Sequence, residues 1–163
     1  MAKMDNTKTN AMRILEREKI PFIAHTYECD EFTDGVSLAD KIGQPREIVY
    51  KTLVTVSKSR EYVVFVIPVA AELDMKEAAA AANEKSVEML HVKDINAVTG
   101  YIRGGCTAIG MKKQYKTVVD RSAESLEKIV VSGGKLGTQL ELKPEDYMRA
   151  CRGVYADITT AQG

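Results

Sequence analysis

Two neighbouring runs of β-branched and aromatic residues constrain the fold of this chain most strongly. The sequence EIVYKTLVTVS covers residues 47–57 and EYVVFVIPV covers residues 61–69, with only the polar residues KSR between them. Such residues fit the pleated surface of a sheet, and a short polar interruption between two runs is typical of a hairpin. We therefore expect an antiparallel hairpin near the middle of a β-sheet.

Shorter patterns predict the other elements. Apolar spacing, capping residues and alanine content favour helices at 9–19, 37–43, 73–84, 93–100 and 143–151, with Thr9 or Asn10 capping the first and Ser37 the second. Strands are expected within 21–27, 86–90, 116–120, 127–134, 138–142 and 153–158. Strands outnumber helices and do not alternate regularly with them. A mixed α+β fold is therefore favoured over a doubly wound parallel one, with a largely antiparallel, curved sheet and helices packed outside.

Length and charge narrow the class of protein. At 163 residues, 45% of them hydrophobic, the chain is expected to form one domain, residues 1–163, with a core that needs no disulfide or metal. The 23 basic and 23 acidic side chains cancel, which argues against broad coating of polyanions but permits a local basic patch. No signal peptide or membrane span is apparent. These features predict a soluble cytoplasmic protein.

The cysteines and histidines form a poor set of metal ligands. Cys29, Cys106 and Cys151 are far apart without a CxxC pair, and only His25 and His91 accompany them. We expect no metal site and a reducing compartment. A nucleophilic Cys106 is conceivable, but without a neighbouring histidine it is better interpreted as a small packing side chain. His25 is better interpreted as a packed or hydrogen-bonded residue than as a base.

The stretch VTGYIRGGCTAIGMKK, residues 98–113, has the glycine content of a binding loop. Gly105 and Gly110 match the spacing of the phosphate-binding loop of nucleotide hydrolases, but the Ser or Thr that would hold magnesium is missing after the lysine. No GxGxxG pattern is present either. The sequence therefore gives no support to a nucleotide hydrolase or a dinucleotide-binding fold.

A more general function remains open for this stretch. Gly104 and Gly105 let a ligand approach the main chain, where N–H groups can bind an anion or an ester carbonyl. Lys112 and Lys113 add positive charge nearby. The alternative is a tight turn between strands with solvated lysines.

A second glycine-rich segment, VSGGKLGTQ, repeats this composition at residues 131–139. Ser132, Gly133, Gly134 and Lys135 directly follow an apolar strand. One such loop is compatible with a simple turn, but two of them beside lysines suggest two walls of one pocket.

Three further side chains are candidates for that pocket. Lys51 interrupts the first apolar run, either as a charge that reaches solvent or as a cation held for a phosphate or carboxylate. Tyr27 and Phe32 flank the polar residues ECDE. They offer an aromatic face for a base or a sugar, or belong to the ordinary core.

Taken in order, the motifs IPFIAHTY, VYKTLV, PVAAELDMKEAA, VEM, TGYIRGGCTAIGMKK and VSGGKLG resemble the YbaK/EbsC family, and its Cys-tRNA(Pro) deacylase branch most closely. The resemblance extends from about residue 10 to Ile158. It implies a barrel-like mixed sheet surrounded by helices. It also implies hydrolysis of the ester that joins a wrong amino acid to tRNA(Pro), without a cofactor, on the acceptor end of that tRNA and possibly together with prolyl-tRNA synthetase. It implies nothing about the oligomeric state.

The resemblance also assigns expected roles to residues. Lys51, Gly104 and Gly105 would act at the ester, with the Lys51 side chain holding phosphate or ribose oxygens and the glycine N–H groups facing the carbonyl. The expected substrate contacts are Tyr27, Phe32, Thr107, Ser132, Gly133, Gly134 and Lys135, and the expected tRNA contacts are Lys112 and Lys113. The implied nucleophile is the thiol of the substrate's own cysteine, which would leave as a thiolactone.

The glycine loop departs from the family at one point. Relatives usually have the pattern GGxSPxGxKK, whereas this chain has Thr107 and Ala108 in place of Ser-Pro. Proline restricts its own backbone and that of the residue before it, so its loss affects the loop that shapes the amino-acid pocket. Deacylation of another tRNA such as Ala-tRNA(Pro) therefore stays open. A function of a different class, non-catalytic binding of an aminoacyl-adenosine or nucleotide, stays open as well.

Overall fold

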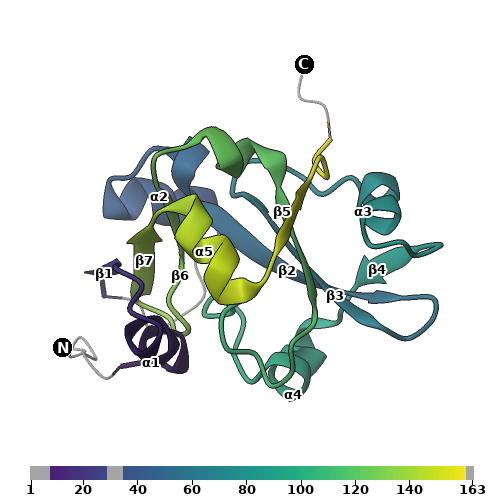
Figure 1. Cartoon of the computed structure of the whole chain (residues 1–163), viewed down its shortest axis with the longest axis horizontal. Coiled ribbons are helices and arrows are strands. Elements are labelled where there is room, and N and C mark those ends of the chain that lie inside the picture. Colours follow the sequence, from purple (N-terminus) through teal and green to yellow (C-terminus); the bar gives the residue numbers. More distant parts are fainter. Residues whose placement is uncertain (1–7, 29–34, 161–163) are drawn as a thin grey trace.

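The two β-branched runs form the expected hairpin at the centre of a sheet. In the computed structural model, which describes residues 8–28 and 35–160, β2 (Tyr50–Ser57) pairs antiparallel with β3 (Tyr62–Pro68). Nearly all of β3 is buried, because other elements cover both faces of this strand (Figure 1). The sequence prediction of a central hairpin is confirmed.

The other predicted elements are present, with boundaries that differ by a few residues. The helices are α1 (Asn10–Arg17), α2 (Gly35–Ile42), α3 (Met75–Ala81), α4 (Ile95–Thr99) and α5 (Pro144–Cys151), with short 3-10 helices η1 (Arg46–Ile48), η2 (Val92–Asp94) and η3 (Arg121–Ser125). The remaining strands are β1 (Ile23–Thr26), β4 (Val87–Met89), β5 (Lys116–Asp120), β6 (Ile129–Ser132), β7 (Thr138–Leu142) and β8 (Val154–Ala156).

The strands form two sheets. The five-stranded sheet has the order β4-β2-β3-β5-β8, and the three-stranded sheet has the order β1-β7-β6. Pairing is antiparallel except between β3 and β5 and between β5 and β8. The two sheets meet at a parallel bridge between Val49 and Val130. The mixed α+β class is confirmed, but across the described residues the sheets do not close into the expected barrel.

Helix ends follow the local sequence signals in most places. The Thr9 side chain caps α1 by accepting a hydrogen bond from the Met12 N–H group, and Asp74 caps α3 in the same way. Gly43, in a left-handed conformation, follows α2. The predicted cap at Ser37 is wrong, because α2 already begins at Gly35.

The glycine stretch is anchored to the core by its own apolar residues. Ile109 is fully buried, and it belongs to the same core cluster as Ala11 and Leu15 of α1 and Val131 of β6. The Tyr101 hydroxyl donates a hydrogen bond to the Ile109 carbonyl oxygen at 2.6 Å. The stretch is therefore held against α1 and the three-stranded sheet.

Replacement of Ile109 by alanine tests this anchoring. Because the side chain is fully buried, Ile109→Ala should lower the free energy of unfolding by about 2–5 kcal/mol. Ile102 lies in the same stretch but is 51% exposed, so Ile102→Ala should stay within about 0.5 kcal/mol of the parent. Denaturant unfolding of the three proteins measures both effects. Equal stability of the two variants would show that the stretch is not anchored through Ile109.

Candidate functional site

A cavity of about 370 Å³ lies where the central hairpin meets both glycine segments. Most of its wall is apolar, contributed by β2, by the segment from Met89 to Ile95 and by Leu38 of α2. Its polar and small lining residues are Tyr50, Lys51, Thr52, Arg103, Gly104, Cys106, Ser132 and Gln139. The cavity thus brings together Lys51, the first glycine segment and the second, which are distant in sequence.

The two glycine segments touch through their main chains. Gly105 is buried, and a Cβ atom added to it would lie 2.8 Å from Cα and 3.0 Å from the carbonyl carbon of Lys135. Real Cβ atoms do not approach backbone atoms this closely, so only glycine fits without movement of a segment. The prediction that the two segments are neighbours is confirmed.

The second segment is held in place from its other side. The Thr9 hydroxyl donates a hydrogen bond to the Gly133 carbonyl oxygen. Gly134 has a φ of +102°, and its Cα faces Thr9 and the ring of Tyr101. Ser132 ends β6, accepts a long hydrogen bond from the Gly134 N–H group at 3.4 Å, and lines the cavity.

The described part of the lining is positively charged. It contains Lys51 and Arg103 but no Asp, Glu or His. Burial lowers the pKa of Lys51 from its ordinary value, and the negative charge of Glu72 partly counteracts this shift. A half-buried ammonium group without a hydrogen bond among the described residues is available to a phosphate, a hydroxyl or an ester of a ligand.

The two glycines of the first segment differ in their surroundings. Gly104 has a φ of +87° and lines the cavity. The Gly105 N–H group instead donates a hydrogen bond to the Ile102 carbonyl oxygen at 2.9 Å. The expected role of that N–H group at an ester carbonyl is therefore wrong, because the group closes a turn, and the contribution of Gly105 is close packing.

Five predicted substrate contacts do not line the cavity: Tyr27, Thr107, Gly133, Gly134 and Lys135. Thr107 is fully buried below the loop, and its hydroxyl faces the Ile109 N–H group at 3.5 Å. The prediction that Thr107 contacts the substrate is therefore wrong, because this side chain lies in the protein interior. Tyr27 follows β1, donates its N–H group to the Gly137 carbonyl oxygen, and has the Lys41 ammonium group 5.5 Å from its ring centroid. Phe32 lies outside the described residues.

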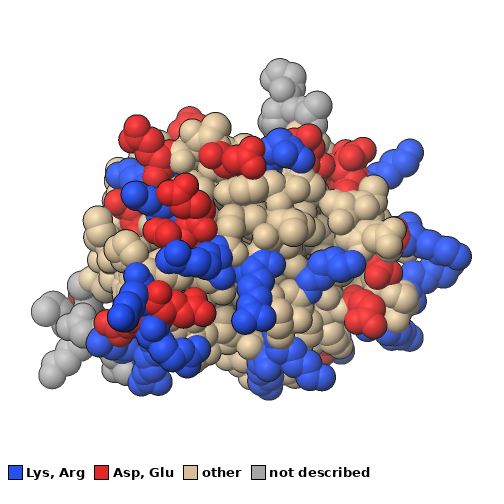
Figure 2. Space-filling model, viewed as in Figure 1, with Lys and Arg blue, Asp and Glu red and all other residues tan. Residues whose placement is uncertain are grey.

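The two lysines predicted to contact tRNA differ from each other. Both are exposed, but Lys112 also donates a hydrogen bond to the Ala97 carbonyl oxygen at 3.1 Å and so caps the end of α4. Figure 2 shows Lys and Arg side chains gathered along the lower edge of the molecule, where Figure 1 places α1 and α4. The zero net charge thus conceals a local basic region.

The sequence patterns did not reveal Gln139, although it lines the cavity from β7. The residue is only 2% exposed and therefore belongs to the inner wall of the cavity rather than to the outer surface. The only signal in the sequence was a polar residue in an apolar strand, TQLEL, which is common at sheet surfaces. Thr52 of β2 was missed for the same reason, and Arg103 because an arginine in a loop is commonly solvated.

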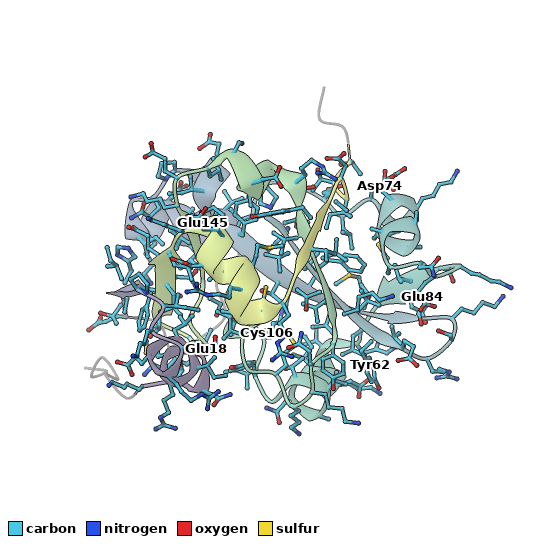
Figure 3. All side chains as sticks on the ribbon, in the orientation of Figure 1. Glu18, Tyr62, Asp74, Glu84, Cys106 and Glu145 are labelled. Carbon is cyan, nitrogen blue, oxygen red and sulfur yellow. The ribbon has the colours of Figure 1, made fainter. Side chains whose placement is uncertain are left out.

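The cysteine and histidine interpretations agree with the geometry. Burial raises the pKa of the Cys106 thiol to about 11, although a hydrogen bond with Thr99 opposes the shift. Cys106, labelled in Figure 3, is therefore a protonated thiol at neutral pH. His25 Nε2 lies 3.0 Å from Glu141 Oε1, and this hydrogen bond is the main cause of the lowered pKa of Glu141.

Within residues 8–28 and 35–160, no group of three or more His, Cys, Asp or Glu side chains has an arrangement that could hold a metal ion. None of the helices there is both long and apolar enough to cross a membrane.

Comparison with known families identifies the class of protein that this fold and cavity define. The model of the aminoacyl-tRNA editing domain matches residues 32–150, which include all the described lining residues of the cavity. The chain therefore belongs to the aminoacyl-tRNA editing domain family.

Individual relatives narrow this assignment. The chain is 45% identical, over 98% of both sequences, to an Enterococcus faecalis protein named "Putative Cys-tRNA(Pro)/Cys-tRNA(Cys) deacylase EbsC". The resemblance to the YbaK/EbsC family is thereby confirmed.

Solved structures support the fold alone. A "putative trans-editing enzyme for prolyl tRNA synthetase" superposes with a TM-score of 0.80 at 15% identity, covering 95% of this chain and 100% of the other. The "hypothetical protein APE2540" superposes with a TM-score of 0.81 at 22% identity, covering 91% and 97%.

The reactivity of Cys106 tests its environment. A shift of its pKa from 9.0 to about 11 leaves about 100-fold less thiolate near pH 8, so iodoacetamide should modify Cys106 about 100-fold more slowly in the native protein than in urea. Peptide mass spectrometry after timed quenching gives both rates. Modification at equal rates would mean that the thiol is neither buried nor protonated as described.

Proposed function

We propose that this protein is a trans-editing deacylase that removes cysteine from mischarged Cys-tRNA(Pro). The observation that carries the proposal is the cavity itself, whose lining combines a half-buried Lys51 with residues of both glycine segments. Family membership supports aminoacyl-tRNA as the class of substrate, and the name of the Enterococcus relative supports cysteine as the amino acid.

The size and lining of the cavity suit the end of a charged tRNA. A volume of about 370 Å³ is within the range of small-molecule sites and accommodates an aminoacyl group with part of its ribose. We assign the Lys51 ammonium group to ribose or phosphate oxygens of the terminal adenosine, with Arg103 adding positive charge beside Gly104. We also assign the Gln139 amide, a donor and an acceptor in the cavity wall, to the aminoacyl group.

The chemistry follows from what the described lining lacks. It offers no carboxylate or imidazole as a general base, and Cys106 is a poor nucleophile because its thiol stays protonated. An aminoacyl ester is already activated, so positioning and charge stabilisation supply the main catalytic contributions. The substrate must then bring its own nucleophile.

Cysteine can do this with its side chain. Its sulfur attacks its own carbonyl carbon, a C–S bond forms, and the ester C–O bond breaks. The thiol proton passes to the departing ribose oxygen, which leaves free tRNA and a cysteine thiolactone that water later opens. The charges of Lys51 and Arg103 favour the substrate thiolate. We assign the Gly104 N–H group to the carbonyl oxygen, because Gly104 lines the cavity.

The alternative amino acid, alanine, receives no support from the loop that suggested it. Thr107 and Ala108 replace the family's Ser-Pro but are buried away from the cavity, so they do not alter its wall directly. A purely binding function leaves Cys-tRNA(Pro) intact, and the assays below distinguish it.

The basic region near α1 and α4 is assigned to the acceptor stem of tRNA(Pro), which makes binding dependent on salt. A chain with no net charge is expected to bind tRNA weakly by itself. We therefore include in the proposal that prolyl-tRNA synthetase presents the mischarged tRNA, and that the protein works in the cytoplasm.

Lys51→Met tests the proposed site. Methionine keeps an unbranched apolar side chain but removes the charge, so kcat/KM for Cys-tRNA(Pro) should fall by about 100-fold or more while the fold is retained. Release of labelled cysteine from the tRNA measures the rate, and circular dichroism checks the fold.

Two matched variants complete the test. Lys58→Met changes an exposed lysine in the β2–β3 turn and should keep the parental rate. Cys106→Ser should also retain most activity, because the protein thiol takes no part in the reaction. Full activity in Lys51→Met would remove Lys51 from the mechanism, and an inactive but folded Cys106→Ser would favour a protein nucleophile.

A further inference from the structure

A second, larger groove of about 960 Å³ lies away from the cavity, and the two share no lining residue. It is bounded by the start of β1, the segment from η3 to β6, the end of β7 and the first half of α5. The proposed deacylation does not use it.

The floor of this groove is apolar and partly open to solvent. Phe22, Leu126, Met148 and Tyr155 pack against the main core cluster but are only partly buried. Ile23, at the edge of the groove, is 57% exposed. A contiguous set of exposed apolar side chains framed by polar residues is typical of a site for another macromolecule.

The rim is predominantly acidic. Five carboxylates line the groove, against Lys128 and Lys143. Two are already engaged: Glu141 with His25 and Lys128, and Asp146 with Arg149. The other three, Glu124, Glu127 and Glu145, form no ion pair with any residue in 8–28 or 35–160.

These unpaired carboxylates act on the floor of the groove. Desolvation is the main cause of the raised pKa of Tyr155, and the negative charges of Glu124 and Glu145 raise it further. Glu145 is labelled in Figure 3 at the start of α5, and Figure 2 shows acidic side chains gathered in the same upper left part of the molecule. The apolar floor of the groove therefore lies in the negative electrostatic potential of these carboxylates.

Charge decides which partner fits. The acidic rim repels phosphates, so a nucleic acid is disfavoured here, whereas the basic lower edge suits one. We propose that this groove docks a protein segment that carries lysine or arginine side chains around apolar anchors. The anchors cover Phe22, Ile23 and Met148, while the basic side chains pair with Glu124, Glu127 and Glu145. Electrostatic complementarity of this kind determines partner choice and association rate. Because the two charged regions are separate, tRNA and such a partner can be bound at the same time.

Binding of a defined peptide tests the proposal independently of deacylation. The probe is a fluorescent amphipathic peptide of lysine and leucine, compared with its glutamate and leucine counterpart by fluorescence anisotropy on the full chain. The lysine peptide should bind and the glutamate peptide should not. Glu124→Lys combined with Glu127→Lys should weaken binding about tenfold or more. Glu145 is left unchanged because a negative charge in the first turn stabilises α5.

Two further variants make the result specific. Glu61→Lys combined with Glu88→Lys makes the same change of charge at exposed positions away from the groove, and should alter affinity by less than about twofold. Ile23→Thr keeps a β-branched side chain in β1 but removes apolar surface, and should weaken binding several-fold while unfolding is unchanged.

Three outcomes would overturn the proposal. The first is equal loss of peptide binding in the groove and control variants, or no binding by the parent protein. The second is that a short RNA binds in the groove and displaces the peptide. The third is that sedimentation shows a dimer that the groove variants dissociate, since a second copy would then be the occupant.

Discussion

The contact between Gly105 and the Lys135 main chain is the constraint on which the candidate site depends. The two segments approach so closely that no side chain fits between them. Each segment is also held by a contact with another part of the fold. The first is held by the buried Ile109, and the second by the hydrogen bond from Thr9 to the Gly133 carbonyl oxygen. The cavity is the space left between this double loop and the β2 strand. A glycine outside the cavity thus positions Gly104 and Ser132 within it.

The charge pattern of the cavity is the basis for assigning a chemical function to this chain. The described part of the chain contains no cluster that could bind a metal. Lys51 is placed by the central hairpin, whose neighbouring apolar residues desolvate it and lower its pKa. In the described lining it is accompanied by Arg103 and by no carboxylate. Such a site attracts phosphate and thiolate and polarises an ester, but it offers no obvious base. The proposed mechanism follows from that combination, because a cysteinyl ester carries its own nucleophile.

Much of the fold could be predicted from the sequence, because its signals are local. The β-branched runs, the cap at Thr9 and the glycine after α2 each depend on neighbouring residues. The parallel pairing of β5 with β3 and of β8 with β5 depends on contacts between distant segments and could not be predicted in this way. The same reason separates the successes and failures at the site. Lys51 was recognisable as a charge in an apolar strand, whereas the use of the Gly105 N–H group in a turn, the burial of Thr107 and the position of Gln139 in the cavity wall are visible only in three dimensions.

Our central inference is that the substrate thiol acts as the nucleophile in a cavity that supplies none. One measurement tests this inference most directly. Purified protein is mixed in excess with Cys-tRNA(Pro), Ala-tRNA(Pro) or Pro-tRNA(Pro), in parallel and with prolyl-tRNA synthetase added, and loss of the labelled amino acid is followed in a single turnover. The account predicts rapid loss of cysteine alone, with cysteine thiolactone as the first product. Comparable loss of alanine or proline, which carry no thiol, would contradict it, and so would stable binding of Cys-tRNA(Pro) without any release.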